Sequence, residues 1–378
     1  MHQKLKILSI VPFPLFPITS GGQKKTIGLL NALSDKVTIK VVTPVPPGCQ
    51  LPENIDVSPH ILPLSFLRYI MPFSLPRLIK LAKDVDIIMM EQPFFGGMMY
   101  LLAFLAKKKW VVQAHNIEYQ RFKSIGKWWW FLLKKYEGWV FRKANAVFFI
   151  TEEDRITALK VFSLPPQKCF VSTYGIDFSS EEKNVEVHNT LHVDYNIPAN
   201  HAIFLFFGVM SYAPNLEALT MIISKLLPQF EEKGFTDYTV LVCGKDLPEY
   251  LQYEINTKHQ RMIYAGFVAD INIIIKQSDV VLNPILTGGG VKTKVIEAIA
   301  LNKTVVSSVS GAIGIDRDVC GTKLMIAPDN QWELFATLCI SALENTSDTP
   351  VIFYETYTWE AIANDYLHKI QQLIRTSA

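Results

Sequence analysis

Several features that would assign a protein class are scarce or absent in this 378-residue sequence. The formal net charge is only +2, too small for a protein that binds nucleic acid by counterion release, so we expect no nucleic-acid partner. Five dispersed cysteines without a CxxC pair argue against a zinc site or a disulfide framework and indicate a reducing, cytoplasmic compartment. The longest charge-free apolar run, Phe94 to Ala106, is too short to span a bilayer. The first ten residues lack the pattern of a signal peptide, so we expect none.

The composition is that of a globular protein, with 49% hydrophobic and 19% charged residues. Short apolar runs alternate with longer helical patterns, which is typical of parallel sheets covered by helices, so the predicted fold class is α/β. The predicted strands are Leu5–Val11, Val37–Val42, Ile87–Met90, Trp110–Gln113, Ala146–Ile150, Cys169–Ser172, Ala202–Gly208, Tyr238–Cys243, Met262–Ala265, Val280–Asn283, Thr304–Ser307 and Thr322–Ile326.

A polar stretch without a strand pattern, Ser179–Asn200, separates two series of strands. It predicts two doubly wound, Rossmann-like domains, at residues 1–185 and 186–352, followed by an amphipathic helix within residues 353–378. Ligands of such sheets bind outside the carboxyl ends of the strands, so we expect the site in a cleft where the two sheets face each other.

The most informative segment runs from a predicted strand through a glycine loop into a helix. Glycines let the backbone approach an anion closely, and a helix N-terminus favours phosphate. Lysines there can neutralise a diphosphate, and a glutamate can accept hydroxyls of a ribose. A flexible turn before a surface helix with solvated lysines is the alternative, and the P-loop spacing is absent. The candidate residues are Gly288, Gly289, Gly290, Lys292, Lys294 and Glu297.

This segment resembles the donor-binding region of the GT-B glycosyltransferases, specifically the retaining family GT4. That family commonly places a carboxylate, seven residues and a second carboxylate at this junction. Glu297 matches the second carboxylate, which in the family holds the nucleotide ribose, whereas Gly289 occupies the position of the first. The resemblance implies a GT-B fold with an N-terminal acceptor domain, a C-terminal donor domain and a C-terminal helix that packs back on the N-terminal domain.

In the first half, the resemblance covers two further segments. Gly21 and Gly22 precede a predicted helix and match the family's N-terminal glycine loop, which approaches the donor phosphates or the acceptor; a simple turn is the alternative. His115 and Glu118 belong to an HN-x-E stretch after a predicted strand. The resemblance implies that His115 orients or stabilises the donor sugar and is not a covalent nucleophile. A structural histidine is the alternative.

In the second half, Gly208 matches the glycine turn after the first strand of the donor domain. Relatives carry an arginine or lysine shortly afterwards, and this chain has Tyr212 and Asn215 instead. Lys245, after the next strand, is a candidate to replace the missing charge, with a solvated loop lysine as the alternative. The loop Gly266, Phe267 and Val268 resembles the one that packs the nucleotide base.

A basic and aromatic segment, Arg121–Tyr136, contains the run Trp128, Trp129 and Trp130. As a helix in the headgroup interface it would place tryptophans at the boundary and lysines near anionic lipid. A core helix whose tryptophans pack on the sheet is the alternative. The first interpretation predicts peripheral contact with the inner face of the cell membrane and, with Glu118, a lipid-linked acceptor.

We therefore predict a retaining glycosyltransferase of cell-surface polysaccharide or glycan synthesis, which moves a sugar from a UDP- or GDP-sugar to a carbohydrate or lipid-linked acceptor. No cofactor or metal is predicted, because Lys292, Lys294 and helix dipoles neutralise the diphosphate. The pairs Asp84 and Asp86 and Asp316 and Asp318 are interpreted as solvated loop acids. The alternatives are an inactive nucleotide-sugar-binding or membrane scaffold protein and a sugar-nucleotide epimerase, which needs an acid–base carboxylate pair.

Overall fold

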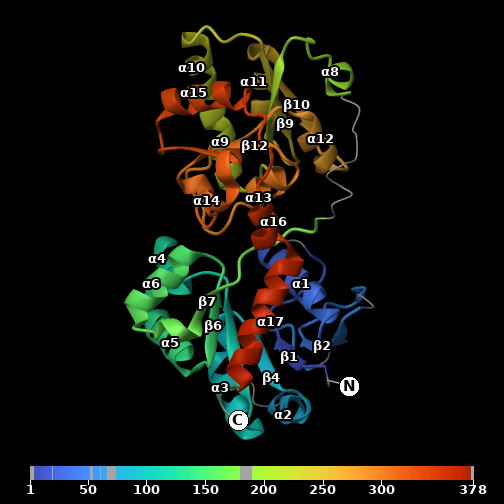
Figure 1. The fold of residues 1–378 in the computed structure, drawn as a ribbon, viewed down its shortest axis with the longest axis vertical. Coiled ribbons are helices and arrows are strands. Elements are labelled where there is room, and N and C mark those ends of the chain that lie inside the picture. The colour runs from blue at the N-terminus through green and yellow to red at the C-terminus, as the bar shows by residue number, and fades with distance from the viewer. Residues whose placement is uncertain are drawn as a thin grey trace. The chain divides into compact units, whose positions relative to one another are not determined.

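A computed structural model describes residues 4–18, 20–51, 54–59, 61–65, 74–178 and 190–375. The chain forms two compact units. Unit 1 contains the residues up to Ile176 together with those from Tyr357 onward, and unit 2 contains Asp177–Thr356. Each unit has its own parallel sheet with helices on its faces (Figure 1), which confirms the predicted α/β class with two Rossmann-like sheets.

The sheet of unit 1 has the strand order β3-β2-β1-β4-β5-β6-β7 among the described residues. Its strands are β1 Lys6–Ile10, β2 Thr38–Val42, β3 Asp56–Ser58, β4 Ile87–Glu91, β5 Lys109–Ala114, β6 Ala146–Phe149 and β7 Cys169–Val171. All except the short edge strand β3 lie where the sequence predicted them. The helices of this unit are α1 Gly21–Ser34, α2 Leu75–Lys83, α3 Gly96–Ala106, α4 Glu118–Ser124, α5 Trp130–Lys143, α6 Glu152–Phe162 and α17 Trp359–Arg375.

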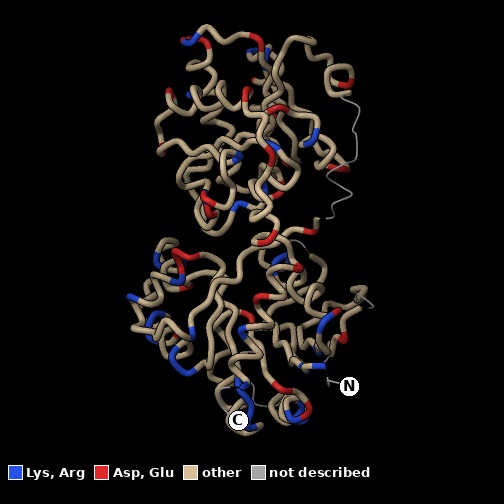
Figure 2. The backbone as a smooth tube through the Cα atoms, in the orientation of Figure 1, with Lys and Arg blue, Asp and Glu red and all other residues tan. Residues whose placement is uncertain are grey.

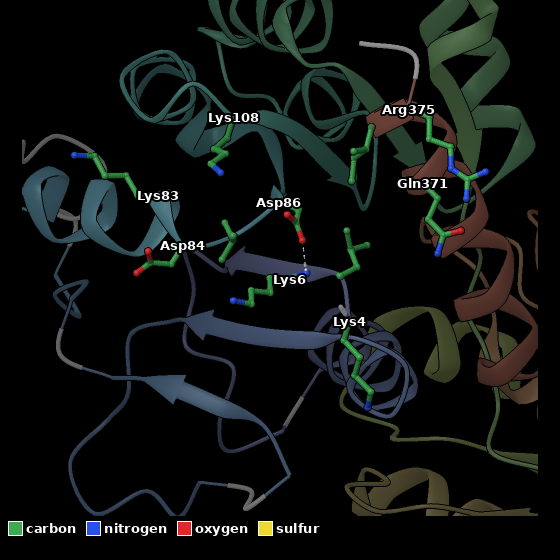
Figure 3. Close-up of a pocket in the computed structure, with 11 residues that line it drawn as sticks. Lys4, Lys6, Lys83, Asp84, Asp86, Lys108, Gln371 and Arg375 are labelled. Atoms are coloured by element: carbon green, nitrogen blue, oxygen red, sulfur yellow. Dashed lines mark hydrogen bonds between the residues drawn. The ribbon is translucent and has the colours of Figure 1, made fainter. Parts of the chain in front are cut away.

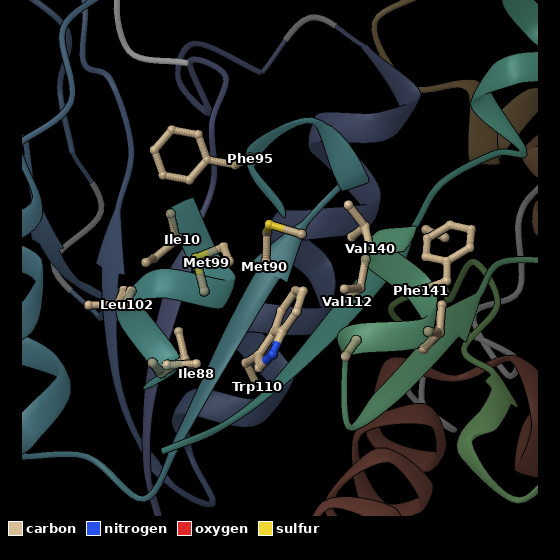
Figure 4. Packing of buried hydrophobic residues seen from close by; sticks show 14 of the residues in the cluster. Ile10, Ile88, Met90, Phe95, Met99, Leu102, Trp110, Val112, Val140 and Phe141 are labelled. Carbon is tan, nitrogen blue, oxygen red and sulfur yellow. The ribbon is translucent and has the colours of Figure 1, made fainter. Parts of the chain in front are cut away.

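Apolar side chains bury both faces of this sheet. On one face, residues of α2, α3, α5 and α6 pack on the strands, and Figure 4 shows Met99, Leu102 and Val140 beside Met90 and Trp110. Each large side chain buried in this way stabilises the fold by about 1.5–3 kcal/mol. The other face is covered by α1 and α17.

Trp359, which is buried, packs the C-terminal helix α17 against the rest of unit 1. A Cβ atom added to Gly28 would lie 2.3 Å from the indole of Trp359, and one added to Gly175 would lie 2.5 Å from it. Only glycine therefore fits at either position against this indole. The backbone N–H of Trp359 also donates to the carbonyl of Ile176 at 3.1 Å.

The sheet of unit 2 has the order β10-β9-β8-β11-β12-β13 among the described residues. Its strands are β8 Ala202–Phe207, β9 Tyr238–Cys243, β10 Met262–Gly266, β11 Val280–Asn283, β12 Thr304–Ser308 and β13 Leu324–Ala327, in agreement with the predicted ones within two residues. The helices are α8 Leu191–Asp194, α9 Ala213–Met221, α10 Leu227–Glu232, α11 Glu249–Lys258, α12 Ile271–Gln277, α13 Thr293–Ala300, α14 Arg317–Cys320, α15 Trp332–Ala342 and α16 Val351–Tyr357.

Two segments do not form one continuous α-helix. Residues 215–231 contain a π-turn at Ile222–Leu226, just before Pro228, which has no backbone N–H to continue the α-helical ladder. The basic aromatic segment is also not one helix, because α4 ends at Ser124 and α5 begins at Trp130. Gly126 between them adopts φ +72°, a left-handed conformation that ends helices. Of the predicted interdomain stretch, residues 179–189 lie outside the described residues, and the remainder includes α8.

Candidate functional site

In unit 2, two glycine turns meet at the carboxyl ends of β8 and β9. Gly208 has φ +152° and Gly244 has φ +150°. A Cβ atom on Gly244 would lie 1.8 Å from the carbonyl oxygen of Gly208, so no other residue fits there. The N–H of Gly244 donates to the carbonyl of Gly266 at 2.7 Å, which joins the turn to the end of β10. The predicted residues Gly208 and Gly266 therefore lie together with Gly244 at the carboxyl edge of this sheet.

The glycine loop after β11 is held from inside by Lys292. This side chain is buried, and its ammonium donates to the carbonyls of Gly288 at 2.8 Å and Gly290 at 3.0 Å. Burial lowers the pKa of Lys292 to about 8. A second tie joins Thr287 to Glu217 of α9 at 2.5 Å. The sequence predicted Lys292 as a contact of the diphosphate, and the structure shows that its ammonium binds carbonyls of the glycine loop.

The second predicted lysine, Lys294, lies in the first turn of α13. Its ammonium donates to Oδ1 of Asn215 at 2.9 Å and lies 4.7 Å from the ring centroid of Phe206. Desolvation lowers the pKa of Lys294 to about 7, with Lys292 adding to the shift and Glu297 opposing it. Asn215, which the sequence presented as a departure from the family pattern, therefore positions the lysine.

The N-terminus of α13 has no side-chain cap, since Lys292 occupies the N-cap position and makes no capping hydrogen bond. The first N–H groups of a helix carry partial positive charge and need a partner. With Lys294 in the same turn, this end of α13 is suited to bind an anion.

Glu297 lies one turn further along α13 and is half-buried. Gly289 stands eight residues earlier, and a Cβ atom built on it would meet no atom within 4 Å. The position where relatives carry a carboxylate is therefore open rather than filled by another side chain of this chain.

The remaining predicted residues of unit 2 are exposed or half-buried at the same sheet edge. Phe267 is 75% exposed, Val268 is half-buried and Lys245 is exposed. The backbone of Lys245 accepts from the N–H of Met210 at 2.9 Å. Phe267 therefore presents a free aromatic face at the edge where the base is expected.

In unit 1, His115 follows the carboxyl end of β5 and is buried. Its Nε2 lies 2.6 Å from Oε2 of Glu91, the last residue of β4, and the same oxygen accepts from Thr26 Oγ1 at 3.2 Å. Beside them, Lys25 donates to Oε1 of Gln113 at 3.2 Å. Burial lowers the pKa of Lys25 to about 8, against the attraction of Glu91.

The predicted glycines Gly21 and Gly22 form the first turn of α1. Ser20 and Gln23 make a capping box at this end, in which the Ser20 side chain accepts from the N–H of Gln23 at 3.3 Å and the Gln23 side chain accepts from the N–H of Ser20 at 2.8 Å. A Cβ atom on Gly22 would lie 3.3 Å from Nδ1 of His115. The structure therefore brings Gly22 and His115 together.

Sequence reasoning missed Lys25, Thr26, Glu91 and Gln113. Lys25 and Thr26 look like ordinary positions of an amphipathic helix, and nothing in the pattern marks them as buried. One signal was present, because Glu91 directly follows the apolar run Ile87–Met90 and so ends a buried strand on a charge.

Glu118 and the tryptophan run have different environments. Glu118 is buried, and its carboxylate accepts from Arg121 at 2.7 Å. Trp128 is 74% exposed, whereas Trp129 and Trp130 pack against the core of unit 1. The interpretation of the run as part of the core therefore holds for Trp129 and Trp130, whereas Trp128 is exposed.

The acidic pairs have structural contacts that the sequence did not predict. Asp86 accepts from the N–H of Lys6 at 2.8 Å, and Asp316 caps α14 by accepting from the N–H of Asp318 at 2.9 Å. Asp86 lies in a pocket at the amino ends of β1 and β4, among Lys6, Lys83, Lys108 and Arg375 (Figure 3). Across the described ranges, no group of three or more His, Cys, Asp or Glu side chains is arranged to hold a metal ion.

Comparisons with known proteins match one family model in each half of the chain. Residues 19–180 match the model described as Glycosyltransferase Family 4, and residues 201–345 match the model described as Glycosyl transferases group 1. No curated protein matches the chain.

Solved structures share the fold at low identity. HepE from Anabaena in complex with UDP is 15% identical, with a TM-score of 0.70 and coverage of 97% of this chain and 100% of that one. A glycosyltransferase from Rickettsia africae is 15% identical, with a TM-score of 0.67 and coverage of 99% of both chains. Sucrose-phosphate synthase from Thermosynechococcus elongatus is 15% identical, with a TM-score of 0.67 and coverage of 98% and 100%. With a family match in each half, these likenesses show that this chain is a glycosyltransferase of the GT-B fold, similar to glycosyltransferase family 4.

Proposed function

We propose that this glycosyltransferase takes a sugar from a UDP- or GDP-sugar and transfers it, with retention of configuration, to a carbohydrate or lipid-linked saccharide acceptor of cell-surface polysaccharide or glycan synthesis. The uncapped N-terminus of α13 beside Lys294 carries this proposal, because it offers N–H groups and a cation to a diphosphate. UDP bound to HepE, a protein of the same fold, supports a nucleoside diphosphate as the ligand.

In the proposed reaction, the bond between the anomeric carbon and the diphosphate oxygen breaks, and a bond to the acceptor hydroxyl oxygen forms. The negative charge that develops on the leaving diphosphate is stabilised by α13 and Lys294, and the diphosphate takes up the acceptor proton. Glu297 accepts hydroxyls of the ribose, and the loop of Gly266, Phe267 and Val268 packs the base through backbone contacts. His115 orients the donor sugar and forms no covalent intermediate.

We further propose that no metal is required, since the helix terminus and Lys294 supply the positive charge that a divalent cation would otherwise provide. Transfer should then keep its rate within about twofold in excess EDTA, because no charge is removed from the site. A loss of more than tenfold that Mg²⁺ or Mn²⁺ restores would contradict this part of the proposal.

The donor assignment is tested by measuring transfer and donor hydrolysis with a panel of UDP- and GDP-sugars. We expect Lys294→Ala and Glu297→Ala to lower kcat/KM at least tenfold, because each removes a contact of the nucleotide. Lys258→Ala, on the exposed end of α11, is the matched control. Unchanged rates in both site variants would refute the assignment. Binding of UDP without turnover of any donor would instead favour the scaffold alternative.

The outward side of α3, α5 and the turn between α4 and α5 supports a peripheral membrane location. Gly96 lets these helices touch, because a Cβ atom there would lie 2.3 Å from Val140. Phe104 is 71% exposed and Trp128 is 74% exposed. We call this the α3–α5 surface, and its exposed apolar side chains are Tyr100, Leu101, Phe104, Leu105, Ile125, Trp128, Phe131 and Leu132.

The part of the chain that carries the α3–α5 surface is strongly basic. Between Gln92 and Thr151 the chain has ten lysines and arginines and two acids, Glu118 and Glu137, both of which are buried. Figure 2 shows basic residues over α5 and the adjoining turn. Exposed apolar side chains in such a basic stretch of the chain are suited to the interface of an anionic bilayer. No helix in the described parts of the chain is long and apolar enough to cross a membrane.

Flotation with lipid vesicles tests this location. We expect binding to vesicles with 30% anionic lipid that falls at least tenfold in neutral vesicles or in the double variant Phe104→Ser and Trp128→Ser. The matched control is Tyr250→Ser with Tyr253→Ser, which removes two equally exposed rings of unit 2 that stand beside Glu249 and Glu254. Equal loss in the control, or no preference for anionic lipid, would overturn the membrane assignment.

A further inference from the structure

A closed group of buried polar side chains lies behind His115, between one face of the unit 1 sheet and the two helices that cover it. Glu91 and Gln113 come from neighbouring strands, where they are paired in register, and Lys25 comes from α1. Tyr366 comes from α17, far along the chain, and burial followed by the charge of Glu91 raises its pKa. All four side chains are at most 1% exposed.

Burying ionisable groups is costly unless they are paired, so their presence here requires a reason. Glu91 and Lys25 attract each other, which lowers the cost of both charges. Oε2 of Glu91 contacts Thr26 and His115, and Oε1 has no hydrogen-bond partner among the described residues. The group is built around one carboxylate, and its shortest contact is to the imidazole.

A carboxylate only accepts hydrogen bonds, so the nitrogen that lies 2.6 Å from it must carry a proton. In the neutral imidazole, a proton on Nε2 leaves Nδ1 as an acceptor. Nδ1 is the ring atom closest to the first turn of α1 at Gly22, at the carboxyl edge of the sheet.

We infer that Glu91 is a positioning residue that fixes His115 as the Nε2–H tautomer, with its Nδ1 lone pair directed toward the first turn of α1. Lys25, whose ammonium donates to Gln113 in the register position beside Glu91, supports the charged carboxylate through electrostatic attraction. Resting on the proposed function, this makes His115 an acceptor for a hydroxyl of the donor sugar, not a proton donor to it. A deoxy sugar that lacks this hydroxyl cannot make the contact, so His115 would contribute to the choice of the donor sugar.

Nitrogen-15 NMR of histidine side chains in the full chain tests the inference without any need for activity. The resonances of His115 are assigned from the spectrum of His115→Gln. We expect a protonated Nε2 and an unprotonated Nδ1 in the wild type at pH 8, and a mixture of tautomers in Glu91→Gln, because an amide can both donate and accept. Tyr366→Phe is the matched control, since it removes a buried hydroxyl of the same group without a contact to His115, and it should keep the Nε2–H tautomer.

A protonated Nδ1 in the wild type, or the same single tautomer in Glu91→Gln, would overturn the inference. Kinetics then separate it from the proposed function. We expect Glu91→Gln to lower kcat at least tenfold with KM for the donor within threefold, and Glu91→Asp to recover part of the loss. If the tautomer is as inferred but His115→Gln transfers sugar at the wild-type rate, the positioning by Glu91 stands and the role of His115 in transfer is refuted.

Discussion

The carboxyl edges of the two sheets use charged side chains in opposite ways. In unit 1, Lys25 and Glu91 are buried, their charges attract each other, and each is hydrogen-bonded to a neighbouring side chain. In unit 2, the glycine loop and the first turn of α13 leave N–H groups uncapped and Gly289 open. The first arrangement fixes the geometry of one imidazole, whereas the second leaves positive potential available to a ligand. Substitutions in unit 1 should therefore affect stability, and those in unit 2 should affect binding.

The largest expected effect is that of Lys25→Met in unit 1. Removing the cation leaves the buried carboxylate of Glu91 without the positive charge that attracts it, and a buried charge left uncompensated costs about 3–5 kcal/mol. The free energy of unfolding from urea titration, followed by a probe in unit 1, measures it. A decrease in the free energy of unfolding of less than about 1 kcal/mol would show that Lys25 does not stabilise the buried carboxylate of Glu91.

The corresponding change in unit 2, Lys294→Met, should weaken the binding of UDP and leave the free energy of unfolding nearly unchanged. We expect the free energy of unfolding to change by less than about 1 kcal/mol, because the change also removes the desolvation cost of the ammonium, and Glu297, the acid that attracts Lys294, is only half-buried, unlike Glu91. Affinity for UDP should fall roughly 10–100-fold, as expected for a lost charge-assisted hydrogen bond worth about 1.5–3 kcal/mol. Calorimetric titration measures the affinity. Strong destabilisation with unchanged affinity would invert the comparison.

The affinity for UDP should also depend on pH in unit 2. The pKa of Lys294 is about 7, so its ammonium is charged below pH 7 and loses its proton above it. A bound diphosphate favours the charged form, and the dissociation constant should therefore rise between pH 7 and 9, by at most tenfold per unit. The other groups that act on Lys294 are Lys292 and Glu297. A Lys294→Met protein should lose most of this dependence between pH 7 and 8, and an identical slope in the variant would contradict the assignment.

The smallest expected effect is that of Gly289→Glu, which restores the carboxylate that relatives carry. Because a Cβ atom there meets nothing within 4 Å, the free energy of unfolding should change by less than about 0.5 kcal/mol. Affinity for UDP should stay within threefold, while the preference among UDP-sugars changes. Thermal unfolding and a donor panel measure both. A large drop in stability would show that the glycine loop is closed rather than open.

The sequence predicted the two sheets well because their strands are buried on both faces, and such strands read as continuous apolar runs. The edge strand β3 is short and partly exposed, and it leaves no such pattern. The sequence named the glycine loop and Lys294 as candidates because glycines and a lysine after a strand are typical of an anion-binding loop. The sequence did not predict the hydrogen bonds of Lys292 to the loop carbonyls or of Lys294 to Asn215, since these depend on side-chain conformation. Lys25 and Glu91, whose charges attract each other, are 66 positions apart in the sequence, so no local pattern reveals their proximity.

Hydrogen–deuterium exchange of the full chain with and without UDP tests the location of the donor site most directly. We expect slower exchange of the backbone amides in the glycine loop and the first turn of α13, over residues 288–295, when UDP is added. The buried network behind His115 should be protected already without UDP and change little. Protection confined to unit 1, or to the basic pocket at the amino ends of β1 and β4, with none in residues 288–295, would refute the proposed donor site.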